Sequence, residues 1–255
     1  MIVDLIHNRQ LLLAFLERGF KTKYKNSYLG IFWSLLNPLA NVLIFTLVFT
    51  VFIKINIKEY PLFLLCTILP WTFFHAALTN GLVSIVEDAH FVKNAAFPTA
   101  VIPFAVVGVN LVNFLLELLM LMPVLIVWGN GISTAWIFLP LLIFLQTLLV
   151  AGLTLLAAAL FVFLRDLNFI MHLGLRLFFY IVPAVYTIDF VPKHLRFFYF
   201  LNPLAVLIDG YSSILMHGHA PSLSWLSFTT VEIVLITYGC ALLFKKMRFS
   251  IAERI

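Results

Sequence analysis

Long uninterrupted apolar segments are the feature that most restricts how this chain can fold. Only 11% of its 255 residues are charged and 63% are hydrophobic, whereas about a quarter of the residues in a soluble domain are charged. Continuous apolar runs also argue against a β-barrel, whose strands alternate over about 10 residues. Six segments reach about the 20 residues that a helix needs to cross a bilayer core, at 33–53, 61–86, 100–128, 136–164, 170–188 and 223–244. The sequence therefore predicts an all-α integral membrane protein with six transmembrane helices.

The distribution of positive charge predicts the orientation of these helices. If the N-terminus lies in the cytoplasm, the cytoplasmic segments carry 12 Lys and Arg residues and the outer segments carry 4. Because cytoplasmic loops are enriched in these residues, we expect both termini in the cytoplasm and the chain in the plasma (inner) membrane. The net charge of +5 therefore reflects membrane orientation, and no nucleic-acid partner is expected.

The segment 1–30 is predicted to form a helix on the cytoplasmic membrane surface. Its apolar residues recur at helical spacing and its polar residues take the other faces. Arg18, Lys21, Lys23 and Lys25 form a dense basic patch near its end, and Trp33 begins the first apolar run where an aromatic belt is expected. Two explanations of the patch stay open: an orientation signal in contact with lipid headgroups, or a phosphate-binding surface.

The segment 189–222, between the last two predicted spans, is too apolar for a solvated loop. Proline residues and the Asn202-Pro203 and Asp209-Gly210 pairs divide it into pieces too short to cross a bilayer. We therefore expect short re-entrant outer helices, because irregular backbone in a bilayer must be buried in protein or line a wet cavity. An outer cap without a function is the alternative.

The sequence contains no motif for catalysis or nucleotide binding. The phosphate-binding pattern G-x-x-x-x-G-K-[ST] is absent, so ATP hydrolysis is expected only from a separate chain. His217 and His219 are two possible ligands, which is too few for a metal site. We expect no catalytic residue, metal or cofactor in this chain.

Two carboxyl groups, Glu117 and Glu232, lie within predicted spans. A charged group at the centre of a membrane helix costs about 2.5–3.5 kcal/mol, so each is a candidate for hydrogen bonding between helices or for proton relay. Hydrogen bonding is favoured, because an ion-coupled transporter is expected to carry more paired acids and bases.

Four motifs occur in an informative order along the chain: KTKYKNSYLGIFWSLLNP at 21–38, EDAHFVKNAAFP at 87–98, RDLNFI at 165–170 and LNPLAVLIDGYSSIL at 201–215. This order resembles the membrane subunits of type 2 ABC exporters for polysaccharides, the Wzm-like permeases of O-antigen export and the related teichoic acid exporters. The resemblance covers essentially the whole chain, and its most specific part is the run from Lys21 to Pro38.

The resemblance implies a homodimer that works with two copies of a separate ATPase, which binds ATP and magnesium. The cargo is a polysaccharide linked to a polyprenyl diphosphate. The segment 87–98 matches the coupling helix that docks on the ATPase, 1–30 supplies a second contact, and 189–222 gates the exit. The implied ATPase contacts are Glu87, Asp88, His90, Phe91, Lys93 and Asn94. Spans one and five line the channel, and the proposed substrate-binding residues are Arg18, Lys21, Lys23, Lys25, Trp33, Phe45, Phe49, Arg176, Phe178 and Tyr180.

Two other functions are kept as alternatives. An ABC exporter of a drug or lipid would share this architecture and motor. A membrane-embedded enzyme of glycolipid synthesis would need a catalytic cluster at a membrane face. The compact charged pairs Arg165-Asp166 and Glu87-Asp88 come without a set of metal ligands.

Overall fold

The structure, a computed structural model, describes residues 8–25, 32–54, 57, 59–94, 98–129 and 131–254. These residues form helices and their connections, with no strand among them. The predicted all-helical membrane fold is confirmed in part. Among the described residues, four helices are long and apolar enough to cross a membrane. They are α4 (Tyr60–Glu87), α6 (Val101–Trp128), the continuous helix made of η2 (Thr134–Phe138) and α7 (Leu139–Phe163), and the first part of α11 (Leu223–Arg254).

The first and fifth predicted spans are shorter or less regular than the other four. α3 (Phe32–Thr46) continues into a six-residue π-helix, η1 (Leu47–Phe52). α8 (Leu167–Ile181) has 15 residues, or about 22 Å at 1.5 Å per residue, against a bilayer core of about 30 Å. Six spans therefore stay a prediction.

α8 ends before the predicted boundary at residue 188, and Pro183 gives the reason. A proline has no backbone N–H and disfavours helical dihedral angles in the residue before it. Val182 accordingly has an extended conformation, with φ −89° and ψ 154°. The backbone that follows is buried and is bound by α4: the Thr67 hydroxyl donates to the Ala184 carbonyl at 2.7 Å, and the Tyr60 hydroxyl donates to the Val185 carbonyl at 2.8 Å. Irregular backbone at membrane depth needs such internal partners.

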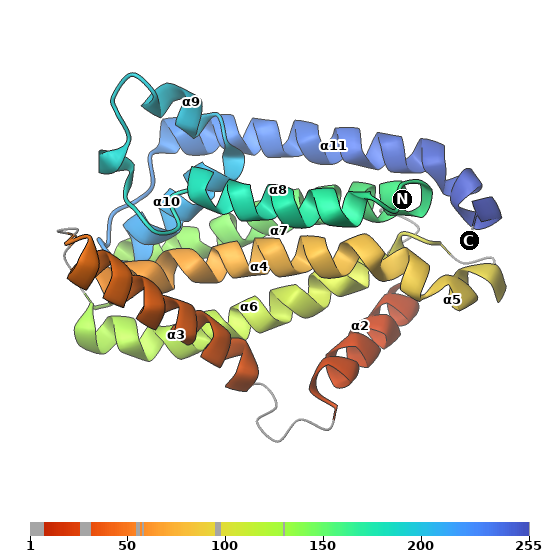
Figure 1. Cartoon of the computed structure of the whole chain (residues 1–255), viewed down its shortest axis with the longest axis horizontal. Helices are drawn as coiled ribbons and strands as arrows, with labels where there is room; N and C mark the ends of the chain where they lie inside the picture. The colour runs from red at the N-terminus through yellow and green to blue at the C-terminus, as the bar shows by residue number, and fades with distance from the viewer. Residues whose placement is uncertain are drawn as a thin grey trace.

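α4 is the central helix of the bundle. It runs lengthwise between α6 and α8, and α11 packs along α7 behind it (Figure 1). Small residues permit the closest helix contacts. A Cβ atom on Gly81 of α4 would lie 2.0 Å from the Thr154 methyl group of α7, and one on Gly152 of α7 would lie 2.9 Å from the Thr237 Cα of α11. α4, α7 and α11 therefore form a tightly packed unit.

The predicted outer segment 189–222 contains α9 (Arg196–Phe200) and α10 (Pro203–Leu215), after a short 3-10 turn, η3 (Ile188–Phe190). The Asn202 side chain accepts a hydrogen bond from the Leu204 N–H, and Pro203 occupies the first helical position, so α10 has a regular N-terminus. α10 is buried along most of its length, whereas α9 has no buried residue. Both lie at the end of the bundle opposite α5 (Figure 1). Their entry into a bilayer stays a prediction.

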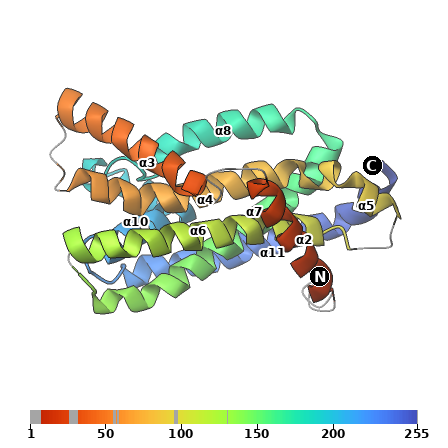
Figure 2. The same ribbon diagram turned by 90° about the horizontal axis from the view of Figure 1, so that it is seen from below.

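Two short amphipathic elements occupy the predicted cytoplasmic segments. α2 (Arg9–Tyr24) lies within the predicted surface helix 1–30, of which 1–7 and 26–30 fall outside the described residues. It crosses α6 obliquely (Figure 2), where Leu16 fits against Gly108 and Val109 against Gly19. α5 (Ala89–Asn94) lies within the predicted coupling helix 87–98, of which 95–97 are not described.

Candidate functional site

A cavity of about 440 Å³ lies where α3, α4 and α8 meet, and we call it the aromatic cavity. Each helix contributes one face. On α4 and on α8 the lining residues follow the spacing i, i+3, i+4 and i+7, which places side chains on one side of a helix. The lining consists of Asn41 and Phe45 from α3, Ile68, Trp71, Thr72 and His75 from α4, and His172, Leu175, Arg176, Phe179 and Tyr180 from α8.

Aromatic rings form a continuous row along the wall of this cavity. Ring centroids are 6.1 Å apart between His75 and Trp71, 5.3 Å between Trp71 and Phe179, and 5.7 Å between Phe179 and Phe45. The row continues through Phe49 to Tyr60, with separations of 6.1 and 6.0 Å. These distances are typical of interacting aromatic pairs. The rings of this row that line the cavity, from His75 to Phe45, offer repeated apolar contacts to a flat ligand.

The aromatic cavity is also basic. Arg176 lines it together with His75 and His172, and the described lining contains no Asp or Glu. A guanidinium group binds phosphate or carboxylate with two parallel hydrogen bonds. The cavity therefore suits a ligand that combines an anionic group with flat apolar faces.

The structure brings together some of the residues predicted to bind substrate and separates others. Phe45, Arg176 and Tyr180 line the aromatic cavity, and Phe49 continues its row of rings. Phe178 instead packs beside Trp71 and Phe74, at centroid distances of 6.2 and 6.0 Å.

Sequence reasoning missed eight of the residues that line this cavity, and the four of these that carry rings are Trp71, His75, His172 and Phe179. The two on α8 were within reach of a simple argument, because they lie four residues before and three after Arg176 and so share its helix face. The two on α4 were not, because α4 is apolar and buried almost all round, and such a helix shows no preferred face in its sequence.

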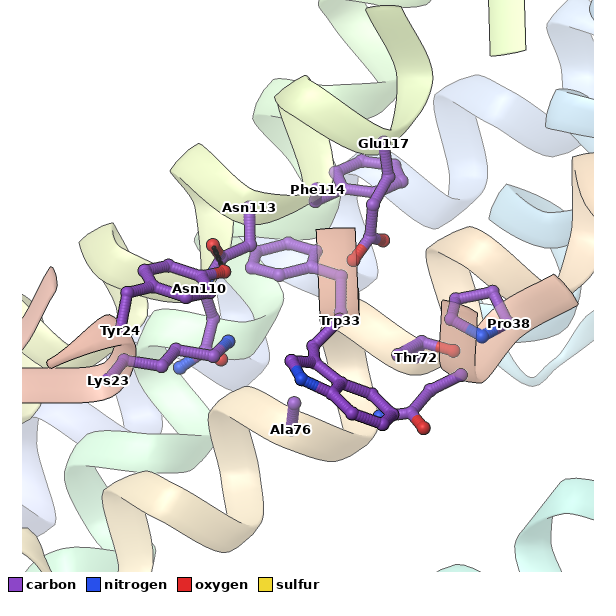
Figure 3. A pocket seen from close by; sticks show the side chains of 12 residues that line it. Lys23, Tyr24, Trp33, Pro38, Thr72, Ala76, Asn110, Asn113, Phe114 and Glu117 are labelled. Carbon is purple, nitrogen blue, oxygen red and sulfur yellow. Dashed lines mark hydrogen bonds between the residues drawn. The ribbon is translucent and has the colours of Figure 1, made fainter. Parts of the chain in front are cut away.

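A second cavity, of about 320 Å³, lies on the other side of α3, between α2, α4 and α6 (Figure 3). We call it the amide cavity, and Thr72 of α4 lines both cavities. The Tyr24 hydroxyl donates to the Asn113 side-chain oxygen at 2.6 Å and joins α2 to α6. The remaining lining residues are Lys23, Trp33, Asn37, Pro38, Phe73, Ala76, Asn110, Phe114 and Glu117. Lys23 and Trp33, both predicted to bind substrate, thus face the amide cavity rather than the aromatic one.

The charge of Lys23 is influenced from two sides. Partial desolvation lowers the pKa of its ammonium group, and the nearby Glu117 carboxylate acts in the opposite direction.

Glu232, the other predicted membrane carboxyl group, has different surroundings. It lies on α11, where its Oε2 atom is buried without a hydrogen-bond partner among the described residues.

The cytoplasmic basic patch is partly neutralised by ion pairs. The Arg18 guanidinium binds the Asp88 carboxylate at 2.9 Å and lies 4.9 Å from the centre of the Phe91 ring. Phe91 in turn packs edge-on against Phe15 at 5.1 Å, so α2 is tied to the start of α5. Lys21 binds Glu17 at 2.6 Å, which lowers the pKa of that carboxyl group.

The other predicted contact residues lie around this junction. Lys25 and Glu87 are exposed, and His90 packs against Phe91 with ring centroids 3.9 Å apart. The side chains of Lys93 and Asn94 lie outside the described part of the chain.

Comparison with known proteins agrees with this architecture. The profile of the ABC-2 type transporter family matches residues 10–216, which run from α2 through α10. The chain is 31% identical over 246 residues to the O-antigen export system permease protein RfbA of Klebsiella pneumoniae, covering 95% of this chain and 94% of that protein. A protein of the same name from Myxococcus xanthus is 28% identical over 257 residues, covering 100% of this chain and 99% of that protein. The chain therefore belongs to the ABC-2 type transporter family, as the order of its motifs predicted.

Proposed function

We propose that this chain is the transmembrane subunit of an ATP-driven exporter. Its cargo is a polysaccharide of the O-antigen type, linked to a polyprenyl diphosphate and moved outward across the plasma (inner) membrane. The aromatic cavity is the observation that supports this cargo most directly. Arg176, His75 and His172 suit a diphosphate, and the row from His75 to Phe45 suits the apolar faces of successive sugar rings.

Weak and repeated contacts suit a polymer that must keep moving. Ring stacking depends little on the identity of each sugar. Each aromatic ring of the row can therefore contact whichever sugar passes it. The single Arg176 has a different role in this proposal: it holds the diphosphate of the lipid carrier, which occurs once per cargo molecule.

The working unit is a homodimer with six spans in each chain and both termini in the cytoplasm. α3 and α8 lie on the same side of α4 (Figure 2), and their outward faces expose Leu43 and Ile44 on α3, and Leu173 and Leu177 on α8. Two copies that meet along these faces enclose their aromatic cavities in one passage. The segment 189–222 gates the outer end of that passage.

The energy comes from two copies of a separate ATPase, which hold the ATP and magnesium. This chain carries no nucleotide-binding motif, and the junction of α2 and α5 offers that partner a basic and aromatic surface. Because Arg18 ties the two helices together, a push from the ATPase on α5 is transmitted to α2.

The test is cargo-stimulated ATP hydrolysis in proteoliposomes that contain this chain and the ATPase that copurifies with it. Polyprenyl-diphosphate-linked glycan should stimulate the wild type. Arg176→Gln should reduce the apparent affinity for the glycan about tenfold or more, since a hydrogen bond to a charged group contributes about 1.5–3 kcal/mol. Lys193→Gln, which removes a charge from an exposed outer turn, is the matched control and should behave as the wild type.

Three outcomes would contradict the proposal. The first is an unchanged glycan response in Arg176→Gln. The second is a chain that purifies without any ATPase, which favours a membrane-embedded enzyme. The third is stimulation by drugs or simple lipids but not by the glycan, which favours the other kind of exporter.

A further inference from the structure

The amide cavity has an unusual distribution of charge. Lys23 lies at one end and Glu117 at the other, with the amide group of Asn113 between them (Figure 3). Trp33 closes one side and is 51% exposed, so the cavity is reached from the outside of the bundle. Its occupant must therefore complement a cation and a carboxylate that are separated by amide groups.

Two buried groups in this cavity have unused hydrogen-bonding capacity. Asn113 is 4% exposed, and its Nδ2 atom has no partner among the described residues, because Tyr24 binds only the Oδ1 atom. Glu117 is 5% exposed and forms no hydrogen bond or close ion pair within the described part of the chain. An ionised carboxylate can only accept hydrogen bonds, and a buried one is costly without a partner. The cavity thus lacks an acceptor beside Asn113 and a donor beside Glu117.

We propose that the amide cavity binds the phosphoethanolamine headgroup of a membrane phospholipid. The phosphate accepts hydrogen bonds from Lys23 and from Asn113 Nδ2, and the primary ammonium donates to Glu117. The volume of about 320 Å³ is at the lower end of the roughly 300–1,000 Å³ of ligand pockets, which suits a headgroup rather than a stretch of polysaccharide.

The arrangement distinguishes ethanolamine from other common headgroups. A trimethylammonium group, as in phosphatidylcholine, has no N–H to donate to Glu117. An anionic headgroup, as in phosphatidylglycerol, brings no cation to that end of the cavity. A bound phosphoethanolamine joins α2 to α6 through Lys23 and Glu117, and so holds in place the helix that Arg18 ties to α5.

The test is native mass spectrometry of the full-length chain with three added phospholipids that have identical acyl chains and ethanolamine, choline or glycerol headgroups. The wild type should retain phosphatidylethanolamine about tenfold better than phosphatidylcholine, as expected from one charged hydrogen bond. Glu117→Gln should remove this preference. Lys23→Gln, at an exposed position, should weaken retention of both lipids and leave their ratio unchanged.

Glu232→Gln is the matched control, because it makes the same change in a carboxyl group on α11, outside the cavity. It should keep the wild-type ratio. Equal retention of the ethanolamine and choline lipids by the wild type would overturn the proposal, as would stronger retention of phosphatidylglycerol or a loss of preference in Glu232→Gln. These measurements on the wild type do not depend on how well any variant folds.

A competition separates this site from the cargo path. Polyprenyl diphosphate should leave phosphatidylethanolamine bound, because it has a phosphate group but no ammonium. If it displaces the phospholipid at equal concentration, the amide cavity belongs to the cargo path and the headgroup proposal fails, while the export function stands.

Discussion

The two cavities share Thr72 and lie on opposite sides of α3, yet they differ in almost every chemical property. The aromatic cavity combines a row of aromatic rings with Arg176 and two histidines, and no carboxyl group is among its described lining residues. In the amide cavity Phe73 and Phe114 stack on each other at 5.2 Å, and the polar part of the lining includes three amide side chains, Lys23 and Glu117. These two rings are at most 2% exposed, so they offer little surface to a ligand. The comparison teaches that the two cavities are distinguished by the polar groups beside their rings: an arginine and two histidines in one, and amides, a lysine and a carboxyl group in the other.

The walls of the two cavities also differ in how firmly they are held. α8 has one buried residue, Leu175, so one wall of the aromatic cavity has few buried contacts with the bundle. The amide cavity is bounded by α4 and α6, which pack tightly on each other and bury many side chains. Elements with few buried contacts move at the lowest free-energy cost. We therefore expect the aromatic cavity to change shape during transport and the amide cavity to keep its shape.

The largest expected effect comes from removing the central ring of the aromatic cavity. Trp71 is 7% exposed and lies between His75 and Phe179. Trp71→Ala should lower the free energy of unfolding by about 3–5 kcal/mol, the range for large aromatic residues in cores. Trp33→Ala, in the amide cavity, removes the same side chain from an exposed position and should cost less than about 1 kcal/mol. Thermal unfolding in detergent compares the two, and equal losses would show that the cavities are equally well packed.

The next largest effect concerns the support of the α8 wall. Thr67→Val removes the hydrogen bond to the Ala184 carbonyl and leaves that buried carbonyl unpaired, which should cost about 1–2 kcal/mol. Thr79→Val is the matched control on the same helix, since among the described residues Thr79 bonds to carbonyls of its own helix. Hydrogen exchange at residues 182–186 should rise in the first variant alone. A similar rise in both would mean that α4 does not hold the end of α8.

A smaller effect is expected from the contact that holds α2 over the amide cavity. Tyr24→Phe removes the hydrogen bond to Asn113 and should cost roughly 0.5–1 kcal/mol, with faster hydrogen exchange in α2. Tyr180→Phe makes the same change in the aromatic cavity and should leave α2 unaffected. If α2 exchanges at the wild-type rate in both variants, α2 is held by its apolar contacts with α6 alone.

The smallest effect on stability belongs to the exposed junction of α2 and α5. Arg18→Asp and Asp88→Arg should each change the free energy of unfolding by less than about 1 kcal/mol, because the pair lies at the surface, with side chains 49% and 20% exposed. Each single variant should nevertheless reduce cargo-stimulated ATP hydrolysis, and the double variant, which exchanges the two charges, should restore much of it. A double variant no better than the poorer single variant would argue against mechanical coupling through this pair.

Much of the fold could be predicted because membrane-length apolar segments have few alternatives. A helix satisfies all its backbone groups within one segment, so segments such as 61–86 and 100–128 predict α4 and α6 to within a few residues. The end of α8 was predicted too late because the apolar run continues past Pro183, and hydropathy carries no information about a missing N–H group. The predicted end of the last span at residue 244 follows the apolar run, while α11 continues as a basic helix to Arg254.

The candidate site was less predictable, because a residue lines a cavity only if it lies on the helix face that is turned toward it. The sequence pointed to Arg176 through its charge and to Phe45 and Tyr180 through their positions, but it placed Lys23 and Trp33 with them. α3 crosses α4, and this crossing divides those residues between two cavities. In helices that are apolar all round, no periodic pattern indicates which face meets which neighbour.

By itself, the sequence determined the helical membrane class, the basic surface before the first apolar run and the membership of the transporter family, since these follow from composition and from the order of local motifs. Only the tertiary structure decided that Arg18 binds Asp88, that Lys21 binds Glu17, and that Arg176 faces a row of aromatic rings. The physical reason is distance. A charge or a ring acts on the groups within a few ångströms of it, and in this bundle helix packing brings those groups together from distant parts of the chain.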